Sequence, residues 1–464
     1  MFSILRFKLP RFLIFPALFS MILALTALPS TRAANSELPS LGEDSIINIE
    51  RERNLGRTVY ERLLSRGLIE TQPLLDRYIN DIGFRLLAGI DNRVRDYRFF
   101  IVKDDSINAF AVPGGYIGVH LGLIYNAQTQ HQLASVIAHE IAHVRLRHGL
   151  DMMEKGRDLS NAAMLATLAG LLLGAVDSQV GAAVAFGGAA GTQQSMINFT
   201  RENEYEADRF GIGLMTSAGF DPNGTVEFFQ FITSKSGGGS FANIEYLRTH
   251  PLGSNRIAEA SARAANAGRG EQQVDDYQLF RDYLLYSNSE HLPDQGGPYL
   301  RALASIQAGD YRLADTRLSE LYRADDENIW YGIAYAENLE RLGRRGEAEL
   351  VYRRLLDIFP GDYALSMRLM QLYKRQGKGE AALKLARELE VRFPEDQQVF
   401  FELSEIYEIL RKPALRLMAQ AEYHRITGNY RQAIRLYDQV LQSSNVDIAT
   451  ESKAREKRLI LLEN

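Results

Sequence analysis

The sequence predicts an α+β fold that is mostly α, with a small sheet in its first domain and an all-α solenoid of helical repeats after it. In this 464-residue chain, apolar residues recur at spacings of three, four and seven over residues 42–91, which is typical of packed helices. Strand-like runs are confined to residues 97–119. Turns at Gly309, Gly343 and Gly377 stand 34 residues apart, which indicates a repeat.

Residues 1–33 are predicted to be a cleavable secretory signal peptide. Arg6, Lys8 and Arg11 precede an apolar run over residues 12–28, and a small-residue cleavage site ends near Ala33. The apolar run is long for a signal, so an uncleaved membrane anchor is the alternative. Cleavage would remove four basic residues and no acid, changing the net charge from −5 to −9.

The composition restricts both the compartment and the chemistry. The chain has no cysteine, which excludes disulfides, cysteine-zinc sites and thiol catalysis. Any metal must therefore be held by the 8 histidines and the carboxylates. A secreted chain without disulfides fits a bacterial periplasm, and the acidic total gives no reason to expect nucleic acid as a partner.

The elements of the first domain follow from local patterns. The pattern is helical over residues 42–91, and strands are expected at 97–102, 107–112 and 116–119. Two further helices are expected, one at 130–148 that is ended by Gly149 and one at 195–218 that is ended by Gly219. Within the apolar segment 161–191 the longest apolar stretch, residues 162–176, is too short for a comfortable membrane span, so we expect a packed helical hairpin or a mobile flap, with peripheral membrane association as a further possibility.

The sequence of the second half of the chain predicts helical repeats. Each of the three glycine turns is followed within five residues by a small residue, Ala314, Ala348 or Ala381. This pattern resembles tetratricopeptide repeats, which stack into a solenoid with a concave binding face. The next turn is expected at Arg411, but Gly428 follows 17 residues later, so we predict about four repeats with a shared or extra helix.

A sparse, glycine-rich stretch separates the two halves. It predicts the following division: signal peptide 1–33, first domain 34–270, junction 271–297 and repeat domain 298–464.

The motif His139-Glu140-Ile141-Ala142-His143 lies within the expected helix 130–148. Histidines at i and i+4 project from one face of a helix, so both rings can converge on one zinc ion. Glu140 lies at the edge of that face, close enough to act on a metal-bound water. An ordinary amphipathic helix with surface histidines is the alternative.

A second group of candidate residues lies on the expected helix 195–218. Glu204 and Asp208 are one turn apart on one face, and a catalytic zinc needs three protein ligands and an open position. Glu204 could complete the ligand set, and Asp208 could accept the free ring N–H of a liganding histidine. Glu206 competes with Glu204 but lies on a different face.

These motifs, together with residues 108–115, Thr249-His250-Pro251 and Arg256, resemble metallopeptidase family 48, a family of gluzincins. The resemblance covers about residues 50–262. It implies a zinc metalloprotease domain with one zinc ion per chain on His139, His143 and Glu204. It also implies that Glu140 is the catalytic base and that Asp208 supports the ligands from behind.

A signal peptide and a repeat array make the chain similar to periplasmic members of that family. The resemblance implies an endopeptidase that assists the assembly of outer-membrane β-barrel proteins and degrades misassembled clients. Its repeats would dock to the β-barrel assembly machinery. A scaffold or chaperone with a latent metal site is the alternative, because a complete ligand set is compatible with a closed site.

Three roles are open for His250. It could bind the oxyanion in catalysis, act as a fourth metal ligand that closes the site, or have no role beyond preceding a proline.

Arg256 could assist the oxyanion or pair with an acid. Residues 108–112 could offer a sheet edge to an extended substrate or form an internal hairpin. The remaining histidines have no partner at ligand spacing and are expected to be structural or at the surface: His120, His131, His148, His291 and His424.

Overall fold

The computed structural model describes residues 43–463 except 89, 91–96, 150–189, 237–243, 269, 271–275, 294–295 and 445. The signal peptide and most of the apolar segment 161–191 therefore lie outside the described residues. Within the described part of the chain, none of the helices combines the length and the apolar character needed to cross a bilayer.

A three-stranded sheet forms where the strand-like runs predict it. The strands are β1 (Arg98–Val102), β2 (Ala109–Val112) and β3 (Tyr116–His120). The order is β1-β3-β2, with β3 parallel to β1 and antiparallel to β2. The β2–β3 turn places Gly114 at φ 90°, and a Cβ there would lie 2.6 Å from the backbone oxygen of Glu52, so only glycine fits. β2 is thus both an internal hairpin strand and an edge of the sheet.

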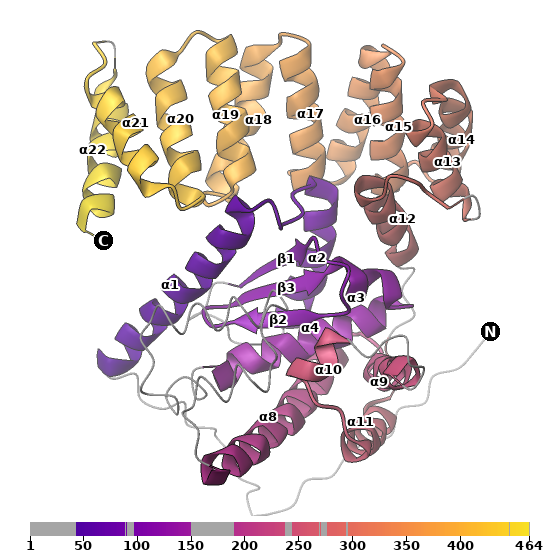
Figure 1. Cartoon of the computed structure of the whole chain (residues 1–464). Helices are drawn as coiled ribbons and strands as arrows, with labels where there is room; N and C mark the ends of the chain where they lie inside the picture. Colours follow the sequence, from indigo (N-terminus) through magenta and orange to yellow (C-terminus); the bar gives the residue numbers. More distant parts are fainter. Residues whose placement is uncertain are drawn as a thin grey trace, which may run out of the picture. The chain divides into compact units, whose positions relative to one another are not determined.

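Helices surround this sheet and carry the candidate residues (Figure 1). In chain order they are α1 (Glu43–Ser65), α2 (Pro73–Leu87), α3 (Leu121–Asn126), α4 (Gln130–Arg145), α8 (Ala190–Ser217), α9 (Asn223–Ser236), α10 (Glu245–Thr249), α11 (Ser254–Ala267) and α12 (Tyr277–Asn288). α4 packs against β2, α8 and α9, which makes it the central helix of this part.

The two ends of α4 have different causes. Its start is fixed by Thr129, whose hydroxyl accepts a hydrogen bond from the backbone N–H of Gln132. Its end was expected at Gly149, and this prediction is wrong. The helix ends at Arg145, and Arg147 reverses the chain in a left-handed conformation with φ 60°.

Five helix pairs follow in the second half of the described chain. They are α13 (Pro298–Gln307) with α14 (Tyr311–Ala324), α15 (Ile329–Arg341) with α16 (Arg345–Ile358), α17 (Tyr363–Arg375) with α18 (Gly379–Arg392), α19 (Gln397–Ile409) with α20 (Pro413–Ile426), and α21 (Tyr430–Leu441) with α22 (Ile448–Glu463). The predicted helical-repeat fold is confirmed.

The expected irregularity after Arg411 is a wrong prediction. Gly309, Gly343 and Gly377 all have positive φ at the turn within a pair, and Arg411 takes the same conformation with φ 52° at the fourth turn. Gly428 lies instead in the connection between pairs, the place that Pro360 and Pro394 hold earlier in the array. Among the described residues no helix is shared: α21 begins 33 residues after α19 and α22 begins 35 residues after α20, so a period of about 34 residues continues to the last pair, and the array has five pairs rather than the four predicted.

The stretch predicted as a junction contains a core helix. Tyr277, Phe280 and Tyr283 of α12 are buried. The Phe280 ring stacks on Tyr78 of α2 at a centroid distance of 4.3 Å and meets the edge of Trp330 of α15 at 6.1 Å. The described residues from 47 onward form one compact unit. The division at residues 270 and 298 stays a prediction.

Three successive repeat pairs contact the sheet-containing part through the starts of α17, α19 and α21. Asp362, which caps α17, lies 2.6 Å from Arg77. The backbone oxygen of Glu395, next to the α19 cap, accepts a hydrogen bond from Arg98 at 3.2 Å. Tyr430, the first residue of α21, donates to Glu61 at 3.0 Å. Because the contacts recur with the repeat, one face of the array is held at three successive pairs.

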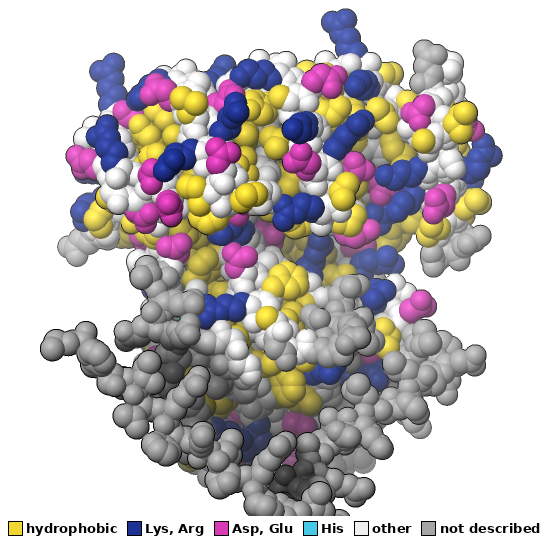
Figure 2. Space-filling view, turned by 180° about the vertical axis from the view of Figure 1, so that it is seen from behind, with side chains coloured by type: hydrophobic (Ala, Val, Ile, Leu, Met, Phe, Trp, Pro, Cys, Tyr) yellow, Lys and Arg dark blue, Asp and Glu magenta, His cyan; other side chains and the backbone are white. Residues whose placement is uncertain are grey.

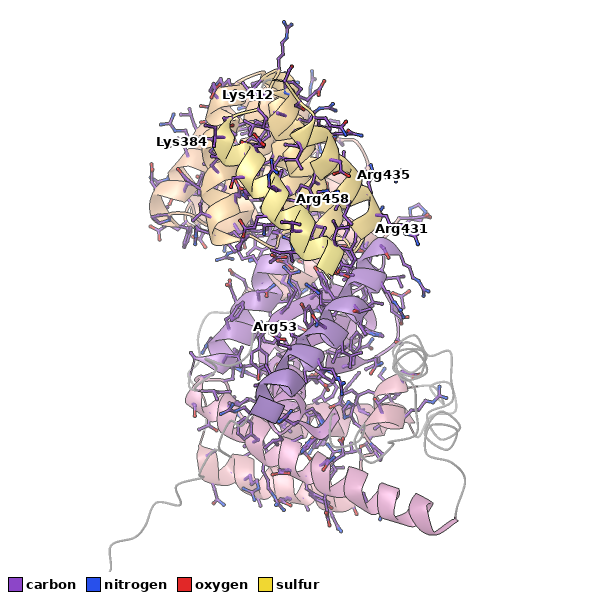
Figure 3. The ribbon with its side chains drawn as sticks, turned by 90° about the vertical axis from the view of Figure 1, so that its left-hand side faces the viewer. Arg53, Lys384, Lys412, Arg431, Arg435 and Arg458 are labelled. Carbon is purple, nitrogen blue, oxygen red and sulfur yellow. The ribbon has the colours of Figure 1, made fainter. Side chains whose placement is uncertain are left out.

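Charged side chains of both signs are interspersed over the repeat helices (Figure 2). Basic side chains are spread over several elements of the array: Lys384 lies on α18, Lys412 just before α20, Arg431 and Arg435 on α21, and Arg458 on α22 (Figure 3). Some are paired: Lys412 lies 3.4 Å from Glu380, and Arg458 lies 2.5 Å from Asp438. The repeat surface is therefore mixed in charge.

Asp76 on α2 provides a test of the contact between the sheet-containing part and the repeat array. Burial, the nearby carboxylate of Asp396 and, more weakly, Glu70 raise the pKa of Asp76 to about 7, against the opposing effect of Arg98. Because the pKa of Asp76 is higher in the folded protein than in the unfolded chain, Asp76 does not reduce the free energy of unfolding below about pH 4. It reduces that free energy increasingly as the pH rises to about 7. Asp76→Asn should therefore increase the free energy of unfolding by roughly 1–2 kcal/mol at pH 8 and by less at pH 5.

Urea denaturation at both pH values measures this difference. Asp357→Asn, an exposed aspartate on α16, serves as the control and should change stability equally at both. An Asp76→Asn effect that does not grow with pH would contradict the prediction.

Candidate metal centre

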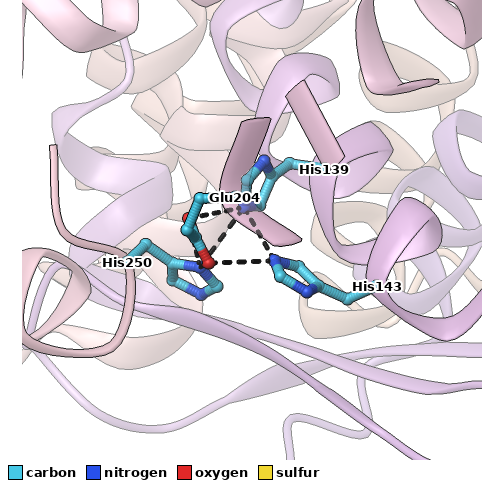
Figure 4. Close-up of side chains that lie close together, drawn as sticks. All are labelled: His139, His143, Glu204 and His250. Atoms are coloured by element: carbon cyan, nitrogen blue, oxygen red, sulfur yellow. Dashed lines mark hydrogen bonds and ion pairs between the residues drawn. The ribbon is translucent and has the colours of Figure 1, made fainter. Parts of the chain in front are cut away.

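Three helical segments bring the candidate residues together (Figure 4). α4 supplies His139 and His143, α8 supplies Glu204, and His250 follows α10 directly. One donor atom from each of these four residues lies within 4.8 Å of the others. Among the described residues this is the one group of side chains with such an arrangement.

The distances within the cluster are those of atoms directed at a common centre. Nε2 of His139 lies 3.0 Å from Nε2 of His143 and 3.4 Å from Oε2 of Glu204. Oε1 of Glu204 lies 3.3 Å from Nε2 of His143. Nδ1 of His250 lies 3.2 Å from Nε2 of His139 and 3.1 Å from Oε1 of Glu204.

The donor set fits a metal ion. Oδ1 of Asp208 lies 3.0 Å from Nδ1 of His139, and a carboxylate only accepts, so this ring carries its proton on Nδ1. Nε2 of His139 then presents a lone pair to a cluster of other acceptors. Acceptors crowded in this way repel one another unless a cation lies between them. Nitrogen and carboxylate donors in this number suit a first-row divalent metal.

The electrostatics of the cluster favour a cation as well. Burial lowers the pKa of His139, but its hydrogen bonds with Asp208 and Glu204 outweigh burial and raise the pKa to about 10. Burial lowers the pKa of His143 to about 4. Burial raises the pKa of Glu204, but the charge of His250 and hydrogen bonds from the three histidines hold it well below its usual range. A metal ion would replace the proton of His139.

Arg256 contacts the two carboxylates of α8 that touch the histidines of the cluster. Its Nε and Nη2 donate to the two oxygens of Asp208 at 2.7 and 2.8 Å, and its Nη1 lies 2.8 Å from Oε2 of Glu204. Arg256 is only 3% exposed. Of the two roles open for it, the structure supports pairing with acids.

Glu140 lies beside the cluster. It is 1% exposed, and its Oε1 lies 3.3 Å from Nε2 of His250 without accepting a hydrogen bond from any described residue. A buried carboxylate oxygen without a donor is unusual and is available to a water molecule or substrate.

One further histidine belongs to this site, although the sequence gives it no partner at ligand spacing. His148 was expected to be structural or at the surface, but it is buried, and its Nδ1 lies 3.0 Å from Nδ1 of His143. Glu206 is 58% exposed, contacts His148 rather than the cluster, and is not a competing ligand. Sequence spacing could not identify His148, because the reversal at Arg147 is what brings it back to His143.

Comparisons with known proteins fit this geometry. A profile of "Peptidase family M48" matches residues 73–264, a range that contains all four cluster residues. The Beta-barrel assembly-enhancing protease of Escherichia coli (strain K12) is 30% identical over 452 residues, covering 92% of this chain and 91% of that protein.

The chain belongs to peptidase family M48. The family resemblance predicted from the sequence is thus confirmed, and the chain is a metallopeptidase. The Beta-barrel assembly-enhancing protease of Yersinia pestis is 29% identical over 444 residues, covering 91% of this chain and 90% of that protein. Mitochondrial metalloendopeptidase OMA1 of Schizosaccharomyces pombe is 25% identical over 214 residues, covering 46% of this chain and 60% of that protein.

The support from Arg256 can be measured against a matched pair on the same two helices. Asp208 of α8 pairs with Arg256 of α11 in the interior, whereas Arg209 of α8 pairs with Glu259 of α11 at 2.6 Å near the surface. Arg256→Gln leaves buried carboxylates without their cation and should lower the free energy of unfolding by roughly 3–5 kcal/mol. Arg209→Gln should cost less than about 1 kcal/mol, because exposed pairs are screened by water.

Chemical denaturation in the presence of a chelator measures both variants without a metal contribution. Equal losses for Arg256→Gln and Arg209→Gln would show that the buried pair has no special role.

Proposed function

We propose that this chain is a periplasmic zinc endopeptidase that takes part in the assembly of outer-membrane β-barrel proteins and degrades clients that are misassembled. The convergence of His139, His143 and Glu204 beside Glu140, whose Oε1 accepts no hydrogen bond from the described residues, carries the proposal. The similarity to β-barrel assembly-enhancing proteases, which extends over both halves of the chain, supports the client class.

Zinc is the metal that this donor set suits best. Two histidines and one glutamate form a known ligand set of catalytic zinc, and the chain has no cysteine to favour a structural site. We propose one zinc ion per chain on His139, His143 and Glu204. Asp208 would hold His139 in the tautomer that frees Nε2, and Arg256 would hold Asp208 and Glu204 in place.

Glu140 is the proposed general base. Bound zinc would act as a Lewis acid and lower the pKa of a water molecule. Oε1 of Glu140, which accepts no hydrogen bond from the described residues, can take a proton from the attacking water. The same carboxyl group can then return this proton to the nitrogen of the amine that leaves.

The edge strand β2 is the proposed binding place for the substrate backbone. β2 pairs with β3 on one side and packs against α4, which carries His139 and Glu140. An extended polypeptide can add to a free sheet edge through main-chain hydrogen bonds, which need little sequence preference. This mode suits a protease with unfolded or misassembled clients.

His250 is proposed to close the site as a fourth ligand. Its Nδ1 lies within hydrogen-bonding distance of both His139 and Glu204, where it can serve as a further metal-ligand atom. A zinc ion with four protein ligands has no open position for water. This arrangement favours a latent protease that also acts as a chaperone, so that the two functions considered from the sequence would coexist.

The signal peptide 1–33 with cleavage near Ala33 would direct the protein to the periplasm. A protease domain over 34–270 and a repeat domain over 298–464 would divide catalysis from docking to the β-barrel assembly machinery. Peripheral membrane association through residues 161–191 stays a prediction, because most of that segment lies outside the described residues.

Glu140→Gln tests the enzyme assignment. Loss of the general base should reduce cleavage of an unfolded outer-membrane protein by about 100-fold or more. Zinc content should stay at one ion per chain, because Glu140 is not a proposed ligand. Glu202→Gln, an exposed glutamate on α8, is the control. Equal cleavage by wild type and Glu140→Gln would overturn the assignment and leave the scaffold function.

His250→Ala tests the closed site. If the closed form holds about 90% of the molecules, its loss should raise the cleavage rate about tenfold, since activity scales with the open fraction. Zinc should remain bound to the other three ligands, as measured by elemental analysis. A loss of cleavage with zinc retained would show instead that His250 acts in catalysis.

A further inference from the structure

Behind His143 lies a second histidine that the proposed mechanism does not use. His148 is 6% exposed, and its ring meets the His143 ring edge-on, with a centroid distance of 5.0 Å and an interplanar angle of 75°. Nδ1 of His148 lies 3.0 Å from Nδ1 of His143, and Nε2 of His148 lies 3.4 Å from Oε2 of Glu206.

These contacts allow one consistent placement of protons. Nε2 of His143 points into the cluster, 3.0 Å from Nε2 of His139 and 3.3 Å from Oε1 of Glu204. A nitrogen that binds a metal has no proton, so a neutral His143 carries its proton on Nδ1. Nδ1 of His148 must then be the acceptor. The proton of His148 is left on Nε2, where it faces Glu206.

The backbone holds His148 in this position against its local preference. The residue before it, Arg147, adopts a left-handed conformation with φ 60°, which is uncommon for a residue with a side chain. Nη2 of Arg147 lies 2.6 Å from Oε1 of the buried Glu52 on α1. A chain segment anchored from another helix therefore turns His148 back onto the end of α4.

We infer that His148 is a positioning residue for the metal: it accepts the Nδ1 proton of His143 and so fixes the tautomer and ring orientation in which Nε2 of His143 faces the cluster. The inference rests on the proposed metal site. It gives each of the two histidine ligands of α4 its own partner, an anionic one for His139 in Asp208 and a neutral one for His143 in His148. The second partner orients a ligand without adding negative charge.

Zinc affinity, measured by competition with a chromophoric chelator, tests this role in the full-length protein. His148→Phe keeps a ring but removes the acceptor and should weaken zinc binding by about 10- to 100-fold. His148→Asn can place its amide oxygen near the position of Nδ1 and should restore affinity to within about threefold of wild type. Cobalt-substituted His148→Phe should show shifted ligand-field absorption bands, whereas His148→Asn should not.

Two controls make the result decisive. Glu206→Gln should weaken binding less than His148→Phe, since Glu206 is mostly exposed, and Glu202→Gln on the same helix should have no effect. Unfolding midpoints of the metal-free variants report folding, and His148→Leu replaces His148→Phe if the larger ring prevents it.

The outcomes separate the two proposals. His139→Ala should abolish tight zinc binding, and if it does not, the proposed metal site itself is wrong. If His139→Ala abolishes binding while His148→Phe and His148→Leu bind zinc as wild type does, the positioning role is wrong. The role is also wrong if His148→Asn loses as much affinity as the variants without an acceptor.

Discussion

The buried contact between Arg256 and Asp208 is the interaction on which the metal centre depends. Asp208 holds the proton of His139, and Arg256 holds both Asp208 and Glu204. Several charged groups in a protein interior are tolerable only when each has a partner with good geometry. The one guanidinium satisfies two carboxylates from α8 and ties that helix to α11. The same contact that stabilises the helix packing therefore aims the donors of the cluster.

Sequence spacing was sufficient for the parts of the site that lie within single helices. His139 and His143, and likewise Glu204 and Asp208, are each separated by one helical turn, so their shared face follows from helix geometry alone. The three strands were predictable from short-range patterns, the turns at Gly309, Gly343 and Gly377 from turn chemistry, and the fourth turn at Arg411 from the 34-residue interval.

The rest of the site depends on tertiary contacts that leave no regular spacing. His250 reaches the cluster from the segment after α10, and His148 reaches His143 only because Arg147 adopts a left-handed backbone. The turn at Gly428 was predicted wrongly, because a glycine turn within a helix pair and one between two pairs have the same local sequence pattern. Arg411 shows the converse, a position where a non-glycine residue takes the conformation that glycine favours.

The contacts along the repeat array also set how the two halves align. The residues presented at successive steps of 34 differ in character: the carboxylate of Asp362, the acidic pair Glu395 and Asp396, and then the hydroxyl of Tyr430. Opposite them lie Arg77, Arg98 and Glu61. Sliding the array by one repeat in one direction would bring Glu61 against the acidic pair, and like charges would repel. Sliding it the other way would separate Tyr430 from Glu61. The order of charged and polar groups along the repeats therefore favours the observed alignment.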